Sequence, residues 1–177
     1  MYSSSYIKQL KEVHYDKSRS KGFGGKVKDL GEFNSFMMQW NPKSLLDYGC
    51  GKGVILAHLK EKYPNVRIFG YDPAIDMFNI APAQSVDCVF SNDVLEHIEP
   101  EFLVSVLEHI NNLSSRYVWL RIDTRPARKI LSDGRNAHLI LESDTWWTEK
   151  INSHISGNIV YKNLNSKGKL DVAIEKG

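Results

Sequence analysis

A short apolar run followed by regularly spaced glycines, at residues 45–53, constrains the fold more than any other feature. Residues 45–48 are typical of a buried strand, and residues 53–63 are typical of a helix. Gly49, Gly51 and Gly53 permit a tight turn and let backbone amides come close to a ligand, because no Cβ intervenes. A ligand carboxylate can therefore lie at the first amides of the helix.

The spacing of these glycines excludes two nucleotide-binding motifs. A phosphate-binding P-loop has Ser or Thr directly after its lysine, whereas Gly53 follows Lys52 here. The dinucleotide fingerprint is Gly-x-Gly-x-x-Gly, and the third glycine of this chain comes one residue early. The motif is Asp-x-Gly-x-Gly-x-Gly, and a purely structural turn is its simpler interpretation.

Strand and helix patterns alternate from Ser44 onward, which is typical of a parallel sheet covered by helices. Strands are predicted at 45–48, 67–71, 88–91 and 117–122, and helices at 53–63, 101–113 and 144–152. The last part differs, because residues 158–164 and 170–175 predict two strands joined by a turn at 165–169. The fold class is therefore α/β with a C-terminal antiparallel hairpin.

The N-terminal part of the chain is predicted to be helical. One apolar face with spacings of three and four residues is formed by Val27, Leu30, Phe33, Met37 and Trp40. Asn41-Pro42 ends this helix, because proline disfavours helical geometry in the residue before it. A shorter helix is expected near residues 6–15, with a glycine-rich loop at 21–25 between the two.

The composition is that of a soluble globular protein, with 177 residues and a formal net charge of +2. No apolar stretch approaches the ~20 residues that span a membrane, and the polar start lacks the apolar core of a signal peptide. Cys50 and Cys88 form neither a disulfide framework nor a zinc pattern. We expect one cytoplasmic domain without a membrane partner; the oligomeric state is not predicted.

An acid follows the second predicted strand, at Asp72. It stands about 20 residues beyond the glycine turn, where an acid can accept hydrogen bonds from two ribose hydroxyls. Capping of a following helix is the simpler interpretation.

The glycine motif resembles the first motif of class I S-adenosylmethionine (SAM)-dependent methyltransferases. Together with residues 22–26, Tyr71-Asp72-Pro73-Ala74 and residues 133–138, it makes nearly the whole chain resemble a short methyltransferase-like family of bacteria and phages with no assigned substrate. The resemblance implies SAM as cofactor in a Rossmann-like sheet. The implied cofactor-binding residues are Asp47, Gly49, Cys50, Gly51, Gly53, Asp72, Pro73, Asn92 and Asp93.

The chain departs from this family pattern after Asp72. Only fourteen residues separate Asp72 from Asp87, which is too few for the usual helix, strand and helix. We therefore expect a trimmed sheet of six strands in which the family's third strand is missing. The acid that normally contacts adenine after that strand is then absent too, so the adenine pocket should be more open.

A polar group follows the strand at 88–91, at the edge where open α/β sheets bind ligands. Asp93, Glu96 and His97 lie within five residues, and His138 follows the next strand. The group resembles the metal site of small-RNA 3′-terminal 2′-O-methyltransferases, which implies Asp93, Glu96, His97 and His138 as ligands of a divalent ion, Mn²⁺ or Mg²⁺. Glu96, His97 and His138 are the candidate catalytic residues. A hydrogen-bonded polar turn is the simpler interpretation. If the cluster binds no metal, we expect its two carboxylates to raise the histidine pKa values.

We expect a single methyltransferase domain over residues 1–177, with a helical cap at 1–43 and a SAM-binding core at 44–177. The expected reaction is O-methylation of a small molecule, a sugar or an RNA-terminal hydroxyl. The alternative is a SAM-binding module without methyl transfer, acting as a sensor or partner subunit. A cluster of basic residues favours phosphate contacts or forms a solvated loop; it comprises Arg121, Arg125, Arg128, Lys129 and Arg135.

Overall fold

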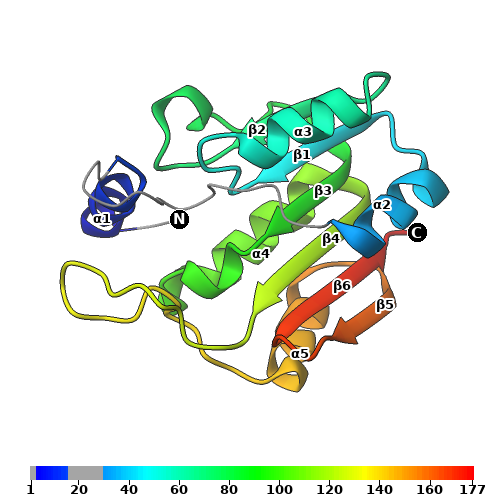
Figure 1. Ribbon diagram of the computed structural model, residues 1–177. Coiled ribbons are helices and arrows are strands. Elements are labelled where there is room, and N and C mark those ends of the chain that lie inside the picture. Colours follow the sequence, from blue (N-terminus) through cyan, green and yellow to red (C-terminus); the bar gives the residue numbers. More distant parts are fainter. Residues whose placement is uncertain (1–2, 16–29) are drawn as a thin grey trace.

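The computed structural model describes residues 3–15 and 30–177. Within these ranges one mixed sheet has six strands in the order β2-β1-β3-β4-β6-β5 (Figure 1). The strands are β1 (Ser44–Tyr48), β2 (Arg67–Tyr71), β3 (Val86–Asn92), β4 (Ser114–Asp123), β5 (Asn158–Leu164) and β6 (Lys169–Glu175). Strands β2, β1, β3 and β4 are parallel, and β6 runs antiparallel to both β4 and β5. The predicted C-terminal hairpin is thus confirmed.

The helices agree with the sequence pattern in number and place within the described residues. They are α1 (Ser4–Tyr15), α2 (Gly31–Trp40), α3 (Val54–Lys62), α4 (Leu103–Leu113) and α5 (Asp144–His154), with short 3₁₀ turns η1 (Asp76–Phe78), η2 (Leu95–His97) and η3 (Pro100–Phe102). Helix α2 ends at Asn41, whose backbone is left-handed before Pro42. Val27 and the expected loop at 21–25 lie outside the described residues.

The sheet lacks a strand between β2 and β3. Residues 72–85 hold only the 3₁₀ turn η1, so β2 is an edge strand of the described sheet. This confirms the trimmed sheet of six strands. A connection this short cannot carry the helix that a parallel crossover to an added strand needs.

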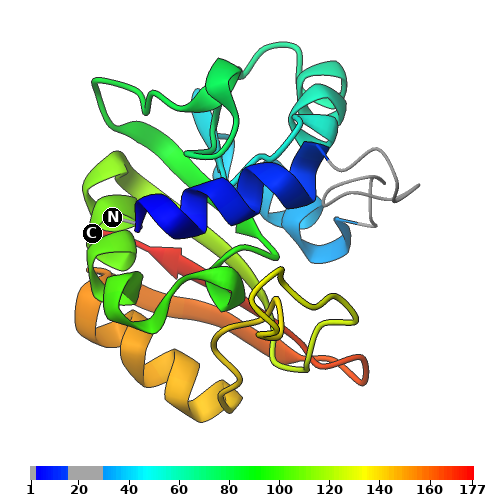
Figure 2. The same cartoon turned by 90° about the vertical axis from the view of Figure 1, so that its left-hand side faces the viewer.

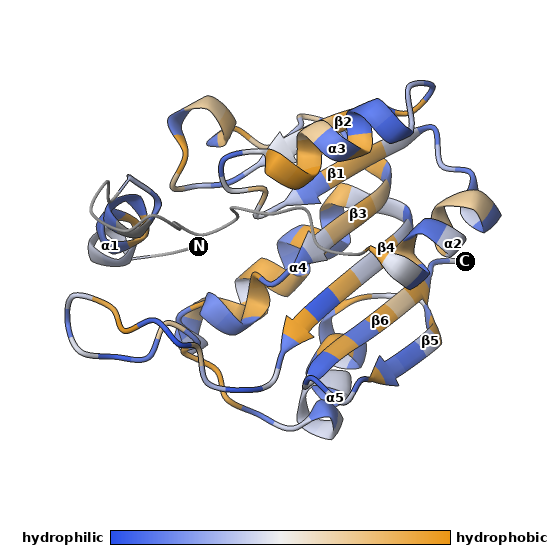
Figure 3. Cartoon of the chain, viewed as in Figure 1, coloured by the Kyte–Doolittle hydropathy of each residue, from blue (hydrophilic) through white to orange (hydrophobic). Residues whose placement is uncertain are grey.

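Two apolar cores lie on the two faces of the sheet, and apolar residues, coloured orange, are frequent in its inner strands (Figure 3). Helices α4 and α5 cover one face, where Trp147 and Ile110 are completely buried. Helices α2 and α3 cover the other face, where the Phe33 ring lies 4.3 Å from the Phe90 ring. Because β1 is buried on both faces, all five of its residues are buried.

Helix α1 lies apart from both faces, across the carboxyl ends of the parallel strands (Figure 2). Its Tyr6 packs with Leu131 and Ala137 in a third, smaller apolar cluster. At the other end of the helix, Lys11 pairs with Asp76 after β2 at 2.6 Å. The helix therefore bridges the loops that follow the two halves of the sheet. None of the described helices has the length and apolar character needed to cross a membrane.

Candidate active site

The glycine turn connects β1 to α3. Gly49, Gly51 and Gly53 all have positive φ, a conformation that costs a residue with a Cβ free energy. Space is also short, since a Cβ on Gly49 would come within 2.4 Å of the Val94 side chain. The Gly49 and Cys50 amides donate to the carbonyl of Tyr71, which joins the turn to the end of β2. The turn therefore requires glycine for its own backbone as well as for access.

Asp72 lies directly beside this turn. Its buried carboxylate accepts hydrogen bonds at 2.9 Å from the Gly51 amide and from the Ala74 amide. The bond from Gly51 fixes the acid against the glycine turn. The bond from Ala74, two residues after Asp72, stabilises the turn of the chain that follows β2. The structural and ligand-binding interpretations of Asp72 are therefore compatible, because each carboxylate oxygen can accept more than one hydrogen bond.

Asp47 is the second-last residue of β1, just before the glycine turn. Burial, followed by the negative charge of Asp72, raises the pKa of this carboxyl to about 7. Its Oδ2 atom is buried and has no hydrogen-bond partner within the described residues. Cys50 is also buried, and burial raises the pKa of its thiol, so the thiol stays protonated.

Polar atoms without partners continue along the end of β3. Ser91 Oγ and Asn92 Oδ1 are buried and lack a hydrogen-bond partner in the described part of the chain. Buried polar atoms in proteins are nearly always hydrogen-bonded, so such a row at one sheet edge is typical of a site that a ligand completes. The row runs from Asp47 through Asn92 towards Glu96.

Glu96, His97 and His138 converge at this edge. One potential ligand atom from each lies within 4.8 Å of the other two. The two imidazole rings meet edge to face, with centroids 4.7 Å apart. Residue Glu96 is completely buried, its Oε1 accepts the Asp123 amide at 2.9 Å, and its Oε2 has no partner within the described residues.

Both histidines are oriented by backbone carbonyls. His97 Nδ1 contacts the Ala137 carbonyl at 2.7 Å, and His138 Nδ1 contacts the carbonyl of Arg125. A carbonyl only accepts hydrogen bonds, so each ring carries its proton on Nδ1. In the neutral ring, Nε2 is then the nitrogen that can accept a proton or coordinate a metal.

The expected rise of the histidine pKa values is wrong for His97. Burial, followed by the charge of His138, lowers the pKa of His97 to about 4. Burial, followed by the charge of Asp93, also raises the pKa of Glu96 to about 8. Desolvation thus outweighs attraction between the carboxyl and the imidazoles, because the group is enclosed. At neutral pH the His97 ring and the Glu96 carboxyl are both uncharged.

Asp93, the expected fourth metal ligand, is not among the three residues whose potential ligand atoms lie within 4.8 Å of one another. Its φ is +57°, and its carboxylate pairs with Lys169 of β6 at 2.7 Å. Lys169 also pairs with Asp123 at 2.8 Å. The hairpin strand thus neutralises Asp93 with a cation that lies 76 positions away in the sequence.

A family model for a methyltransferase domain matches residues 18–158. The chain belongs to this methyltransferase family. Among curated proteins, none matches the sequence significantly.

Solved structures share the fold. The 1,6-didemethyltoxoflavin-N1-methyltransferase of Burkholderia thailandensis, solved with S-adenosylhomocysteine (SAH), superposes with a TM-score of 0.71 at 14% identity, covering 99% of this chain and 91% of that one. The DhpI–SAH complex gives 0.62 at 16% identity, covering 99% and 98%. The magnesium protoporphyrin IX methyltransferase of Synechocystis PCC 6803, also with SAH, gives 0.61 at 11% identity, covering 98% and 95%. The predicted class I methyltransferase fold is confirmed.

Sequence reasoning missed the part of this methyltransferase site that α1 supplies. The Tyr6 hydroxyl donates to the carbonyl of His97. The ring of His14 is buried above the glycine turn, where a Cβ on Gly51 would lie 3.3 Å from His14 Cε1. The only available signal was the apolar face of a short helix, which indicates burial without naming the surface that it covers.

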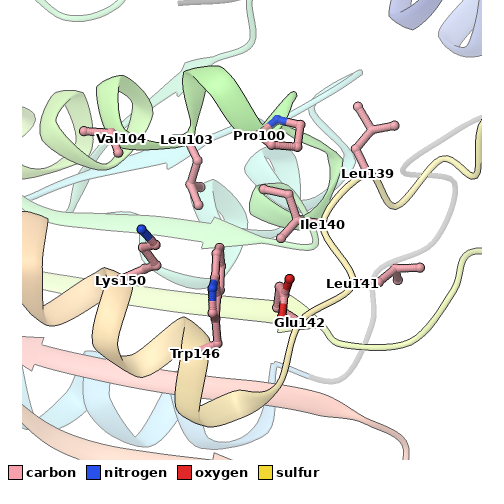
Figure 4. A pocket seen from close by; sticks show the side chains of 9 residues that line it. All are labelled: Pro100, Leu103, Val104, Leu139, Ile140, Leu141, Glu142, Trp146 and Lys150. Atoms are coloured by element: carbon pink, nitrogen blue, oxygen red, sulfur yellow. The ribbon is translucent and has the colours of Figure 1, made fainter.

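An apolar recess lies between α4, α5 and the segment that follows His138 (Figure 4). It has a volume of about 170 Å³ and is lined by Pro100, Leu103, Val104, Leu139, Ile140, Leu141, Glu142, Trp146 and Lys150. Leu139 directly follows His138, and the Ile140 amide donates to the Glu96 carbonyl at 3.1 Å. The recess therefore begins one residue beyond the histidine pair.

Aspartates neutralise most of the basic cluster after β4. Arg121 makes two hydrogen bonds to Asp171, at 2.5 and 2.8 Å. Arg125 pairs with Asp123 at 3.3 Å, and Arg135 pairs with Asp133 at 2.8 Å. These arginines serve internal contacts, which weakens the phosphate-binding interpretation of the cluster.

Proposed function

We propose that this methyltransferase binds SAM across the glycine turn and methylates a hydroxyl oxygen that enters beside His97 and His138. The observation that carries the proposal is the pair of facing imidazoles, each anchored through Nδ1, next to the buried carboxyl of Glu96. An oxygen acceptor must lose its proton to react, and a neutral imidazole is suited to take it. A nitrogen acceptor that is already neutral needs no such base.

Three observations support SAM as the cofactor. Asp72 is fixed against the glycine turn, where it can accept the ribose hydroxyls. Asp47 Oδ2 is a buried acceptor without a partner among the described residues, as the α-ammonium of SAM requires. The fold is shared with SAH-bound methyltransferases. In place of the missing third-strand acid, the highly exposed side chains of Met77 and Ile80 can give the adenine ring apolar contacts.

The acceptor is proposed to be a small molecule with a hydroxyl group, a sugar included, in preference to an RNA terminus. RNA binding relies on basic side chains that contact phosphates. Arg121, Arg125 and Arg135 are instead paired with aspartates. The apolar recess beside His138 offers a surface for the non-reacting part of a small acceptor.

The reaction then needs few chemical groups. Held at the glycine turn by Asp47 and Asp72, SAM would supply an electrophilic methyl group to the acceptor oxygen and would itself become SAH. Burial lowers the pKa of His97 to about 4, so this ring is uncharged but only a weak base at neutral pH. The ring of His138, which faces it, is therefore the proposed acceptor of the hydroxyl proton, and His97 holds the acceptor oxygen in place. Positioning and exclusion of water supply most of the remaining rate enhancement.

The same side chains fit a divalent metal. Glu96 Oε2 is a buried acceptor without a partner within the described residues, and one ring nitrogen from each of the two histidines completes a set of one oxygen and two nitrogens. Such ligands suit Mn²⁺ better than Mg²⁺, which prefers oxygen. A bound metal would lower the pKa of the acceptor hydroxyl and orient it. The proposed ligands are Glu96, His97 and His138, without Asp93.

Metal binding gives a prediction about Glu96. We expect Mn²⁺ to bind more tightly as the pH rises towards the Glu96 pKa of about 8, because the carboxyl must lose its proton first. Calorimetric titration with Mn²⁺ should show binding to the unmodified protein and none to Glu96→Gln. Glu108→Gln, at an exposed carboxyl of α4, is the matched control. Equal Mn²⁺ affinity of Glu96→Gln and the unmodified protein would exclude the site.

The raised pKa of Asp47 gives a prediction about SAM. Below the pKa of about 7 this carboxyl is neutral and cannot pair with the α-ammonium, so SAM affinity should fall by about tenfold per pH unit below that value. Asp47→Asn should bind SAM more weakly and lose this pH dependence. Calorimetry at several pH values measures both. An unmodified protein whose SAM affinity is independent of pH across this window contradicts the assignment.

The proposed reaction is tested by SAH release. Purified protein is incubated with SAM, with and without Mn²⁺, and with three pools: phenols and alcohols, sugars, and short RNAs. We expect release with a pool of small hydroxyl compounds and an oxygen-linked methyl group in the product. A product methylated on nitrogen, or turnover with the RNA pool alone, would overturn the proposed acceptor.

A further inference from the structure

The Tyr6 side chain reaches from α1 to the histidine pair. It is 1% exposed, and its hydroxyl donates to the main-chain carbonyl of His97. Burial, followed by the charge of Glu99, raises the pKa of this hydroxyl, which therefore stays protonated and able to donate. No motif of the sequence assigns a role to this tyrosine.

The ring of Tyr6 contacts the other support of His97. It packs with Ala137 in the small cluster that also contains Leu131. The carbonyl of Ala137 is the acceptor for His97 Nδ1 at 2.7 Å, and the next residue is His138. The hydroxyl of this side chain thus holds the main chain of His97. Its ring packs against the segment that anchors the His97 imidazole and that carries His138.

The start of α1 is fixed to the same segment. The Ser3 amide and hydroxyl donate to the two carboxylate oxygens of Glu99, at 2.9 and 2.7 Å. Glu99 is buried and lies two residues after His97. These bonds place Tyr6 reproducibly, because the helix cannot shift along the site without breaking them.

We propose that Tyr6 is a positioning residue of the methyltransferase, which holds His97 and the segment of Ala137 and His138 so that the two imidazoles face one another. The inference rests on the proposed role of this pair in accepting the proton of the substrate. Tyr6 itself touches neither imidazole nitrogen, so it acts through His97. Helix α1 then contributes to the active site a positioning residue that the strands of the sheet do not supply.

The test uses Tyr6→Phe, which removes the hydroxyl and keeps the ring in its apolar cluster. Tyr63→Phe is the matched control, because the Tyr63 hydroxyl also donates one hydrogen bond, to Asn34 at 2.8 Å, away from the site. Nitrogen-15 NMR of the full chain reports which ring nitrogen of each histidine is protonated and how fast the Nδ1 proton exchanges with water. This readout needs neither SAM nor an acceptor.

We expect the Nδ1 proton of His97 to exchange faster in Tyr6→Phe, with altered ring nitrogen shifts of His97 and His138, and no change in Tyr63→Phe. Calorimetry should show the SAM affinity of Tyr6→Phe to be nearly unchanged. Ring signals identical to the unmodified protein, even with a lowered melting temperature, would overturn the positioning role. Failure of SAH release with every acceptor would instead count against the proposed function and leave these NMR results valid.

Discussion

Replacing His138 by alanine is expected to reduce turnover by about 10²- to 10⁴-fold, the usual contribution of a positioned acid or base. The His138 ring faces His97 at 4.7 Å and is within metal-ligand range of Glu96, so its loss removes a proton acceptor and a potential ligand together. SAM affinity should stay nearly unchanged, because the cofactor contacts proposed here lie at Asp47 and Asp72. Steady-state SAH release and SAM calorimetry separate the two quantities.

The control for this prediction is His154→Ala. His154 lies at the end of α5, with its ring 4.0 Å from Glu108 and far along the chain from the glycine turn. That variant should retain full turnover. If His138→Ala retains the activity of the unmodified protein, the histidine pair does not take the substrate proton.

Replacing Asp72 by alanine is expected to weaken SAM binding by about 1.5–3 kcal/mol, the value of hydrogen bonds to a charged group, which is roughly 10- to 150-fold in affinity. The variant also removes the acceptor of the Gly51 and Ala74 amides. A measurement of the melting temperature must therefore accompany the SAM calorimetry, so that a loosened turn is distinguished from an unfolded protein.

Asp76→Ala is the matched control for Asp72. Asp76 is also an acid after β2, but its exposed side chain pairs with Lys11 of α1. Its loss should leave SAM affinity nearly unchanged. An Asp72→Ala variant that stays folded and binds SAM as tightly as the unmodified protein would show that the ribose does not bind this acid.

The fold could be predicted from local sequence signals. Apolar runs gave the strands, and the distance between Asp72 and Asp87 gave the missing third strand, because a helix and a strand need a minimum length of chain. The convergence of Glu96, His97 and His138 also followed from the fold. Carboxyl ends of neighbouring parallel strands share one edge, so residues after β3 and β4 meet there.

Contacts between distant segments could not be predicted in the same way. Lys169, at the start of β6, neutralises Asp93, which follows β3. Tyr6 of α1 donates a hydrogen bond to the carbonyl of His97. Neither pairing has a local pattern, because each depends on where the hairpin and α1 settle in three dimensions. The pKa of His97 was misjudged for a related reason, since sequence proximity of carboxylates says nothing about burial, which dominates the shift.

We expect SAM to bind across the glycine turn with its reactive methyl group directed at the histidine pair. A crystal structure of the full chain with SAH tests it most directly. In that crystal structure we expect the ribose hydroxyls on Asp72, the α-ammonium on Asp47, and the thioether sulfur turned towards His97 and His138. SAH bound elsewhere, or bound at the turn with its sulfur facing away from both histidines, would contradict it.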